Sequence, residues 1–432
     1  MKTVKAELSS SPAQTKLMPL RYCLVLTFLL IAGTAGAADL AELQETALAN
    51  REVIRGYIAE LERSRKEVTL ARSGLYPSLD VAYTASWLDE ATAVEDRENR
   101  VASGRISWNI FAGFRDRYRI GSARLRRQAE YHQLQGVKQD IKLAVALRYL
   151  AIYQGRANLK VAEDSTSTLA KLHEDAVNRF GVGLIRKSEM LKFKVDLDNA
   201  VIAEKKARAE LAKSVAFLAR EVGAEVDAGR LSFAEFAELP AAGDREVYEE
   251  EMLARRSEIA FLEELIGAAA MQVKAERARY YPSVDVAGVY NKYDDPPNSF
   301  TTDDDEIRTQ LTLSMNLFDG FGKKTRVVAA RLEVEGLRHD LAETRQDFLI
   351  RLGNLFLDYQ VSVDNVVVAE SGIAQAEENL RVNRVAYEEG AAAESELLDA
   401  IANLSRAKSN YVAALSEGFA THFQIARMVE RL

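Results

Sequence analysis

The sequence predicts a mainly α-helical chain, built from a duplicated unit, in which long coiled-coil helices are joined to a small transmembrane β-barrel. Three observations lead to this fold class. The 432-residue chain repeats itself at offsets of 205 and 207 residues, it has long stretches with few glycines and prolines, and four of its segments alternate between apolar and polar residues.

Composition excludes several classes of function. Hydrophobic residues make up 48% of the chain and charged residues 28%, so neither a disordered chain nor a bundle of apolar membrane helices fits. The net charge of −8 argues against nucleic acid as a partner, because a phosphate-binding surface needs an excess of Lys and Arg. The sequence contains no phosphate-binding loop and no nucleophile elbow, so we expect neither an enzyme nor a cofactor.

Residues 1–37 are predicted to be a cleaved signal peptide. They combine an apolar segment at 23–32, a small-residue site at 35–37, and the basic residues Lys2, Lys5, Lys16 and Arg21. The alternative is an uncleaved membrane anchor, but about ten apolar residues are too few for a span of ~20. Cleavage removes four basic residues and one acidic residue, which changes the net charge from −8 to −11. It also removes Cys23, the only cysteine, and with it any disulfide or thiolate site.

Two duplicated blocks predict the strands. RSGLYPSLDVA at 72–82 returns as RARYYPSVDVA at 277–287, and ISWNIFAGF at 106–114 returns as LSMNLFDGF at 313–321. The offset rises from 205 to 207 between the blocks, so two residues are inserted in the polar stretch between them, as at a hairpin tip. We therefore expect four strands, at about 78–88, 101–111, 283–293 and 306–318.

Each predicted strand has one apolar and one polar face. The apolar faces of the first and fourth strands comprise Leu79, Val81, Tyr83, Ala85 and Trp87, and Ile307, Leu311, Leu313, Met315 and Leu317. Their length suits tilted transmembrane strands of ~9–11 residues, with Trp87 and Trp108 near the membrane interfaces or on the lipid face. The alternative is a soluble sheet that packs on a helix. Since the smallest known membrane barrels have about 8 strands, several chains must share one barrel.

The segments between the strands are predicted to be helical, because Ala, Leu, Glu, Arg and Lys dominate them. Long helices are expected at 114–179 and 321–387, each roughly 100 Å long at 1.5 Å per residue. Apolar or small residues at 3- and 4-residue spacing indicate a coiled-coil seam, as at Leu134, Val137, Ile141 and Ala144.

Each long helix is followed by a turn and a second helix. We expect turns at 180–187 and 388–393 and helices at 188–222 and 394–430. Gly183 and Gly390 permit a left-handed conformation in these turns, and Ser188 and Ser395 are candidates to cap the helices that follow.

The chain is thus divided into the signal peptide, a first repeat at 38–222, a linker at 223–243 and a second repeat at 244–432. We expect short irregular helices in the linker, packed outside the main helices, because Pro240 interrupts it and the long periodicity is lost. Metal binding is not expected. His132 and His339 are repeat equivalents, for which a packing role is favoured over a metal ring across subunits.

These features resemble the TolC family of bacterial outer-membrane efflux and type I secretion channels, over nearly the whole chain after the signal peptide. The most specific motifs are the Tyr-Pro-Ser strand entries at 76–78 and 281–283, the Asn-x-Phe-x-Gly-Phe strand exits at 109–114 and 316–321, and the turns at 180–184 and 387–390.

The resemblance implies a homotrimer in the outer membrane of a Gram-negative bacterium. Its 12-stranded barrel continues as a helical tunnel into the periplasm. Such channels are passive ducts for small-molecule efflux or type I protein secretion, and they dock on a periplasmic adaptor protein and an inner-membrane transporter. The alternative is a periplasmic coiled-coil adaptor or interaction protein without a pore, which the two duplicated strand hairpins disfavour.

The resemblance also assigns a gate at the turns. The family's gate tyrosine falls on Tyr387, the gate carboxylate of the first repeat on Glu189, and two aperture carboxylates on Glu396 and Asp399. Glu396 and Asp399 are three residues apart on one helical face, so three chains would place six acids around a narrow opening. The alternative for each acid is a solvated helix side chain.

One family position departs from the pattern, because the arginine that clamps the closed gate falls on Ala392. Arg186 and Lys187 are candidates to replace it. The surface on which adaptor hairpins dock falls on Val182, Gly183, Leu184 and Gly390. A plain helix turn is equally compatible with those four residues.

Overall fold

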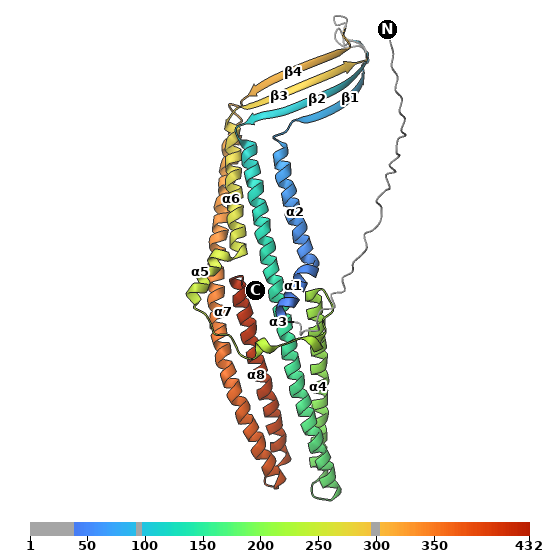
Figure 1. The fold of residues 1–432 in the computed structure, drawn as a ribbon, viewed down its shortest axis with the longest axis vertical. Coiled ribbons are helices and arrows are strands. Elements are labelled where there is room, and N and C mark those ends of the chain that lie inside the picture. The colour runs from blue at the N-terminus through green and yellow to red at the C-terminus, as the bar shows by residue number, and fades with distance from the viewer. Residues whose placement is uncertain (1–38, 92–96, 295–302) are drawn as a thin grey trace, which may run out of the picture. The chain divides into compact units, whose positions relative to one another are not determined.

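The computed structural model of the chain describes residues 39–91, 97–294 and 303–432 (Figure 1). The predicted signal peptide and most of the two predicted hairpin tips lie outside these residues. Ala38–Leu432 form one compact unit by their contacts. The fold class is confirmed, since this unit is mainly helical and contains four strands.

The helices and strands occur in the same order in both repeats. The first repeat contains α1 (Leu40–Asn50), α2 (Glu52–Ser73), β1 (Ser78–Trp87), β2 (Glu98–Ala112), α3 (Arg115–Gly181) and α4 (Lys187–Val222). The second contains α5 (Arg245–Arg255), α6 (Ser257–Arg277), η3 (Ala278–Tyr280), β3 (Ser283–Tyr293), β4 (Asp305–Ser314), α7 (Gly322–Glu388) and α8 (Glu394–Met428). The long helices α3 and α7 have 67 residues each.

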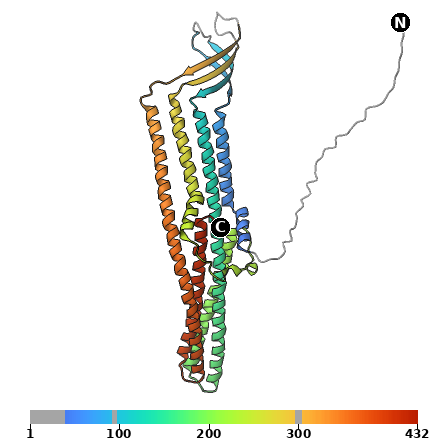
Figure 2. The same ribbon diagram turned by 60° about the vertical axis from the view of Figure 1, so that its left-hand side comes forward.

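Four helices reach the sheet, and two shorter helices pair with the opposite halves of the long ones. Helices α2, α3, α6 and α7 lie side by side below the strands, and each contacts the next in that order (Figure 2). Helix α4 packs along α3, and α8 packs along α7. No helix within the described ranges combines the length and the apolar composition that a membrane span requires.

The four strands form one antiparallel sheet in the order β1-β2-β3-β4. Leu79 lies opposite Ile106, and Val286 lies opposite Leu311, so the apolar residues share one face. The other face is polar and hydrogen bonded. Across it, Ser78 Oγ lies 2.7 Å from Ser107 Oγ, Ser283 Oγ lies 2.8 Å from Ser314 Oγ, and Asn109 Nδ2 donates to Asp285 Oδ1 at 2.6 Å.

The end of the fourth strand differs from the expectation. We expected this strand to reach residue 318, whereas β4 ends at Ser314. Ser314 pairs with Ser283, the first residue of β3, and Pro282 before it has no N–H to donate. Met315 and Leu317 therefore continue the sequence alternation without a partner strand among the described residues. Conversely, β2 is longer than expected because it pairs with both β1 and β3.

Two consecutive left-handed residues connect the sheet to each long helix. Gly113 and Phe114 have φ of 64° and 66°, and Gly320 and Phe321 have φ of 66° and 67°. Phe114 and Phe321 occupy the position before the first helical residue of α3 and α7. The Gly-Phe pair of the strand-exit motif thus sets the angle at which the chain enters the helix.

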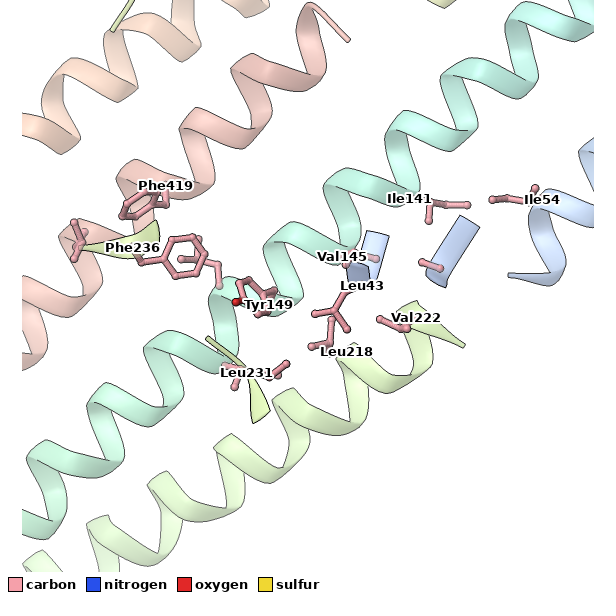
Figure 3. Packing of buried hydrophobic residues seen from close by; sticks show 14 of the residues in the cluster. Leu43, Ile54, Ile141, Val145, Tyr149, Leu218, Val222, Leu231, Phe236 and Phe419 are labelled. Atoms are coloured by element: carbon pink, nitrogen blue, oxygen red, sulfur yellow. The ribbon is translucent and has the colours of Figure 1, made fainter. Parts of the chain in front are cut away.

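The largest core cluster lies at mid-length of α3 and includes the linker. Phe236, in the short turn η2 (Ala234–Phe236), is 1% exposed, and its ring centroid lies 5.6 Å from that of Tyr149 and 4.8 Å from that of Phe419 (Figure 3). We expected the linker to pack outside the main helices. The linker contains two short turns, η1 (Ala228–Arg230) and η2; η1 has no buried residue, whereas Phe236 of η2 is buried and packs against residues of α3 and α8.

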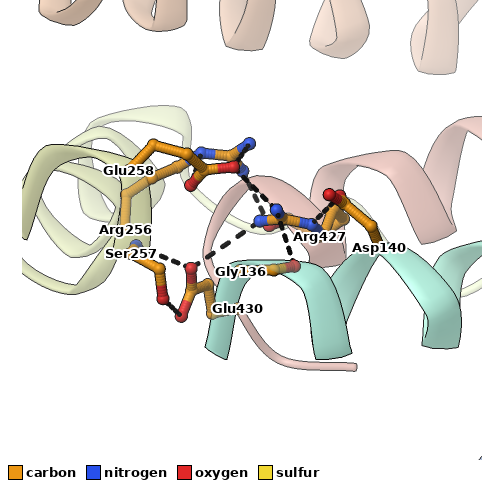
Figure 4. Close-up of polar contacts among 7 residues, drawn as sticks. All are labelled: Gly136, Asp140, Arg256, Ser257, Glu258, Arg427 and Glu430. Atoms are coloured by element: carbon orange, nitrogen blue, oxygen red, sulfur yellow. Dashed lines mark hydrogen bonds and ion pairs between the residues drawn. The ribbon is translucent and has the colours of Figure 1, made fainter. Parts of the chain in front are cut away.

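A buried polar cluster fixes the end of α8 (Figure 4). Arg427 is almost fully buried; its guanidinium lies 2.7 Å from both Asp140 and Glu258 and donates to the Gly136 carbonyl at 3.2 Å. Arg256, at the break between α5 and α6, donates to the Arg427 carbonyl at 2.8 Å. Burial, reinforced by the Arg427 charge, lowers the pKa of Arg256 to about 10.

The first repeat uses the equivalent contact. Arg51, 205 residues before Arg256, lies at the break between α1 and α2 and donates to the Arg220 carbonyl at 3.0 Å. Arg220 lies 207 residues before Arg427. In both repeats, therefore, an arginine at a helix break donates to a carbonyl in the last turn of the helix that follows the long one, α4 or α8.

Candidate functional site

The candidate site is the pair of turns at the ends of the helices farthest from the sheet (Figure 1). We call residues 179–192, between α3 and α4, tip 1, and residues 386–399, between α7 and α8, tip 2. Each tip contains one of the predicted glycines and carries residues assigned to a gate or to adaptor docking.

Tip 1 is closed by a Schellman motif. The Leu184 N–H donates to the Arg179 carbonyl and the Gly183 N–H donates to the Phe180 carbonyl, both at 2.9 Å. Gly183 has φ of 78°, the left-handed conformation that glycine adopts without a Cβ penalty. These two bonds satisfy carbonyls at the end of α3.

Tip 2 repeats this motif 207 residues later. The Ala391 N–H donates to the Ala386 carbonyl at 2.8 Å, and the Gly390 N–H donates to the Tyr387 carbonyl at 3.1 Å. Gly390 has φ of 75°. The two tips therefore have the same backbone, and one of the motif carbonyls in tip 2 belongs to the predicted gate tyrosine.

The helices that follow the turns, α4 and α8, begin two residues earlier than caps at Ser188 and Ser395 require. We expected Ser188 and Ser395 to cap them, but Arg186 and Ala393 occupy the N-cap positions, without a side-chain cap bond. Their extended backbone lets the Arg186 carbonyl accept from the Glu189 N–H, so Ser188 already lies within the helix.

The residues assigned to docking form the outer surface of the tips. Val182 and Leu184 are 73% and 74% exposed. A Cβ added to Gly183 or Gly390 meets no atom within 4 Å, so both glycines border open space. Tip 1 thus presents two bare apolar side chains, whereas tip 2 presents alanines beside Gly390.

Two of the three charged residues assigned to the gate in tip 1 are paired. Arg186 Nε lies 3.0 Å from Glu189 Oε1 within the first turn of α4. Arg186 is largely exposed, while the Glu189 carboxylate is mostly covered. Lys187 is exposed and has no carboxylate within ion-pair distance among residues 39–91, 97–294 and 303–432. The structure thus shows no ion pair for Lys187 within the described part of the chain, and its role in the gate stays a prediction.

Tyr387 links the two helical hairpins, α3–α4 and α7–α8. Its ring lies edge-on to Phe193 of α4, with centroids 5.8 Å apart, and the Arg179 guanidinium lies 5.5 Å from its centroid. Burial raises the pKa of the Tyr387 hydroxyl. The Arg179 charge opposes this shift, while the Glu189 and Glu394 carboxylates add to it.

An ion pair joins the same two hairpins. Lys192 Nζ of α4 lies 2.6 Å from Glu394 Oε1, on the first residue of α8. Lys192 is half exposed and Glu394 is mostly covered. The hydrogen bond from Lys192 lowers the pKa of the Glu394 carboxyl, so this group is ionised at neutral pH.

The two predicted aperture acids stand apart from these contacts. Glu396 and Asp399 are both exposed on the first turns of α8. Neither has an ion-pair partner in the described part of the chain. The structure therefore brings together Arg186 with Glu189, and Tyr387 with the first hairpin, but leaves Glu396 and Asp399 free on the surface of tip 2.

Sequence reasoning missed Arg179, Lys192, Phe193 and Glu394. Comparison of the repeats at offset 207 contains a signal for three of them. Lys187 aligns with Glu394, Lys192 with Asp399, and Arg179 with Ala386, so the charge is reversed or lost at each pair. Among the described residues, no group of three or more His, Cys, Asp or Glu side chains is arranged to hold a metal ion.

A family model supports the resemblance inferred from the motifs. The model described as "Outer membrane efflux protein" matches residues 43–224 and 249–418. These two segments correspond to the two repeats and omit the linker.

A curated relative is also similar in sequence. "Protein CyaE" of Bordetella pertussis is 28% identical over 307 residues, which are 69% of this chain and 64% of that protein. The chain thus matches somewhat less than two thirds of the relative's length.

Solved structures share the fold. A structure of CusC, from work on its folding and transmembrane channel formation, has a TM-score of 0.77 at 17% identity and covers 90% of this chain and 91% of that chain. The outer membrane protein VceC of Vibrio cholerae has a TM-score of 0.76 at 18% identity and covers 90% and 95%.

Proposed function

The chain belongs to the outer membrane efflux protein family, and we propose that three copies form the outer-membrane duct of a tripartite export system. Family membership makes it a transport protein of the Gram-negative outer membrane that extends into the periplasm, and not an enzyme. In the proposal the duct is passive. A periplasmic adaptor docks on it, and an inner-membrane transporter delivers small molecules or a polypeptide.

The observation that carries the proposal is the bare apolar face of the sheet. Leu79, Val81, Ile307, Leu311 and Leu313 are each between 70% and 81% exposed. A soluble protein covers such a face with a second layer, whereas lipid solvates it directly. A pore-free adaptor has no use for this surface.

The sheet also has two free edges, along β1 and β4. Unpaired backbone N–H and C=O groups are very costly in lipid, so an open edge is excluded there. Pairing β4 of one copy with β1 of the next removes both edges. Three copies then supply 12 strands, above the minimum of about 8 for a membrane barrel.

A pair of arginine substitutions on adjacent residues tests the lipid face. Leu311 lies on the apolar face near the middle of β4, and Thr312 lies on the polar face. Leu311→Arg should abolish trimer recovery from outer-membrane fractions, because an arginine costs ~2–4 kcal/mol at the bilayer midplane. Thr312→Arg should leave it intact, since its side chain faces the lumen. Equal trimer yields, or recovery of the unmodified protein in the soluble periplasm, would refute the channel.

We further propose that the tips close the periplasmic end of the duct. Tyr387 packs against the first hairpin, and the Lys192–Glu394 pair adds a second link between the hairpins. The Arg186–Glu189 pair orders the start of α4. These are weak contacts, since an exposed ion pair is worth ~0–1 kcal/mol, so the gate opens on docking rather than by breaking one strong lock.

In this proposal Glu396 and Asp399 line the aperture, and Val182, Gly183, Leu184 and Gly390 receive the adaptor. Glu396→Ala with Asp399→Ala should reduce cation selectivity in planar bilayers without raising conductance. Unchanged selectivity would place both carboxylates off the lumen. Loss of drug tolerance or of protein secretion on deletion would identify the transported class.

A further inference from the structure

A groove lies where the sheet meets the helices. It has a volume of about 830 Å³ and runs between the end of α2, the first turns of α3, and α6. We call it the junction groove, and define it by Leu75, Phe114, Arg117, Arg124, Met271 and Lys274. Its lining combines apolar side chains with three cations.

The three cations of the junction groove have no carboxylate partner. Arg117, Arg124 and Lys274 are exposed, and none forms an ion pair with any residue in the described ranges. The neighbouring Arg115 and Arg119 differ, because both lie within 4 Å of Asp116. No acidic side chain lines the groove, so its positive charge is uncompensated.

The positive charge continues around the helices. A second cavity, of about 630 Å³ between α6 and α7, shares Lys274 and adds Arg277, Arg331 and Arg338, with Glu335 as its one lining acid. The equivalent segments 115–131 and 322–338 contain 11 Lys or Arg and 4 Asp or Glu, in a chain whose net charge is −8. Both repeats therefore concentrate basic residues just below the sheet.

The junction groove adjoins residues of the apolar strand face. Trp108 shares that face with Ile106, and its Nε1 donates to the Leu75 carbonyl at 3.0 Å. Phe111 lies opposite Val284 at the end of β2, and its ring lies edge-on to Phe114, with centroids 5.3 Å apart. Aromatic residues between an apolar strand face and a row of cations are typical of a membrane–water interface.

We propose that the junction groove binds an anionic glycerophospholipid of the periplasmic leaflet. The inference rests on the proposed function, because it requires the sheet to lie in the bilayer. Arg117, Arg124 and Lys274 bind the phosphate of the headgroup, for which the arginine guanidinium offers paired donors. One acyl chain runs along Leu75 and Phe114 toward the strands.

The expected contribution of the cations is large enough to measure. A Lys or Arg beside an anionic lipid surface strengthens binding by about fivefold, so three together supply about 100-fold. A zwitterionic phosphatidylcholine headgroup carries no net negative charge and should not gain from them. The groove should therefore select phosphatidylglycerol over phosphatidylcholine.

Native mass spectrometry of the full-length protein in neutral detergent tests this. The probes are phosphatidylglycerol, phosphatidylcholine and inorganic phosphate. The test variant carries Arg117→Gln, Arg124→Gln and Lys274→Gln. The matched control carries Lys171→Gln, Lys205→Gln and Lys206→Gln. These changes remove the same charge from exposed sites on α3 and α4 outside the groove. Circular dichroism checks that both variants are folded.

The unmodified protein and the control should retain phosphatidylglycerol, and the test variant should bind it about 100-fold more weakly. Equal binding by test and control variants would overturn the site. Displacement of the lipid by millimolar inorganic phosphate would show a general phosphate site instead of a lipid site. Bilayer conductance of the unmodified protein separates the two proposals. Absence of conductance refutes the channel. Normal conductance together with unselective lipid binding refutes only this inference.

Discussion

The two repeats have nearly the same backbone and carry different charges. Tip 1 and tip 2 are both Schellman motifs, with glycine φ of 78° and 75°. Yet tip 1 contains four basic residues and one acid, whereas tip 2 contains five acids and no basic residue. The comparison teaches that a few residues fix the turn, and that the remaining positions are free to differ between the repeats.

The ends of α4 and α8 show the same contrast. In the first repeat Gly223 takes φ of 71°, and a Cβ there would lie 3.0 Å from Asn50 Cβ. Its equivalent Glu430 takes φ of 57°, and its carboxylate accepts from the Ser257 N–H and Oγ. The second repeat thus uses a strained non-glycine residue to cap α6, and adds the buried Arg427 cluster.

The largest expected effect comes from the buried cluster. Arg427→Ala should destabilise the protein by about 3–5 kcal/mol, because it removes a buried guanidinium that pairs with Asp140 and Glu258 and leaves the Gly136 carbonyl without its donor. The equivalent Arg220→Ala should cost less than about 1 kcal/mol, since the Arg220 side chain is 68% exposed. Thermal unfolding followed by circular dichroism measures both. Equal losses would mean that the repeats are also energetically equivalent here.

The second-largest expected effect on stability is at Gly113 and Gly320, where the strands lead into the long helices. Gly113→Ala should cost about 2–5 kcal/mol, because a Cβ there overlaps the Ala278 carbonyl oxygen and lies 2.7 Å from Tyr281 Cβ, in addition to the left-handed penalty. Gly320→Ala should cost only about 1–2 kcal/mol, since its Cβ meets nothing within 4 Å. Folded yield and unfolding temperature compare the two. Indistinguishable variants would contradict the crowding at Gly113.

Charge reversal at the tips should act on gating. Lys192→Glu places two like charges together and should raise open probability in planar bilayers by about fivefold, the equivalent of about 1 kcal/mol. Lys187→Glu should change it less than about twofold, because Lys187 has no carboxylate partner among the described residues. Adding Glu394→Lys to Lys192→Glu should restore the closed state. Failure of this swap would remove the pair from the gate.

The smallest effect is expected with pH. The pKa of Glu394 is lowered from its ordinary value of 4.5, so its link to Lys192 is fully present above pH 4.5 and is lost as pH falls through the lower, folded value. The Lys192–Glu394 pair should therefore cause no change in conductance from pH 7 to 4.5, and its loss should raise conductance below pH 4.5. Glu394→Gln should remove this part of the acid response. An unchanged response would assign it to other carboxylates.

Local signals predicted most of the fold. Strand alternation, the paired Gly-Phe exits and the turn glycines depend on neighbouring residues, so their positions follow from the sequence. The end of β4 did not, because Met315 and Leu317 keep the alternation while the partner strand begins only at Ser283. Where a strand ends is decided by its partner, and the alternation of one segment does not contain that information.

The candidate site was less predictable for a similar reason. The Lys192–Glu394 contact joins residues 202 positions apart, and Arg427 contacts residues from α3 and α6. Nothing within one repeat specifies which side chains of the other will face it. The charge reversal between aligned positions indicates complementary tips, but it does not select Lys192 over Lys187.

The equal length of α3 and α7 has a consequence for symmetry. Each has 67 residues because the two-residue insertion falls between the strands and not in the helices. In the proposed trimer the six tips would follow a pseudo-sixfold axis in their backbone and only a threefold axis in their charge. A ring of six identical partner subunits would therefore meet two alternating binding surfaces, tip 1 and tip 2. Alternate subunits of the ring would then bind with different affinity.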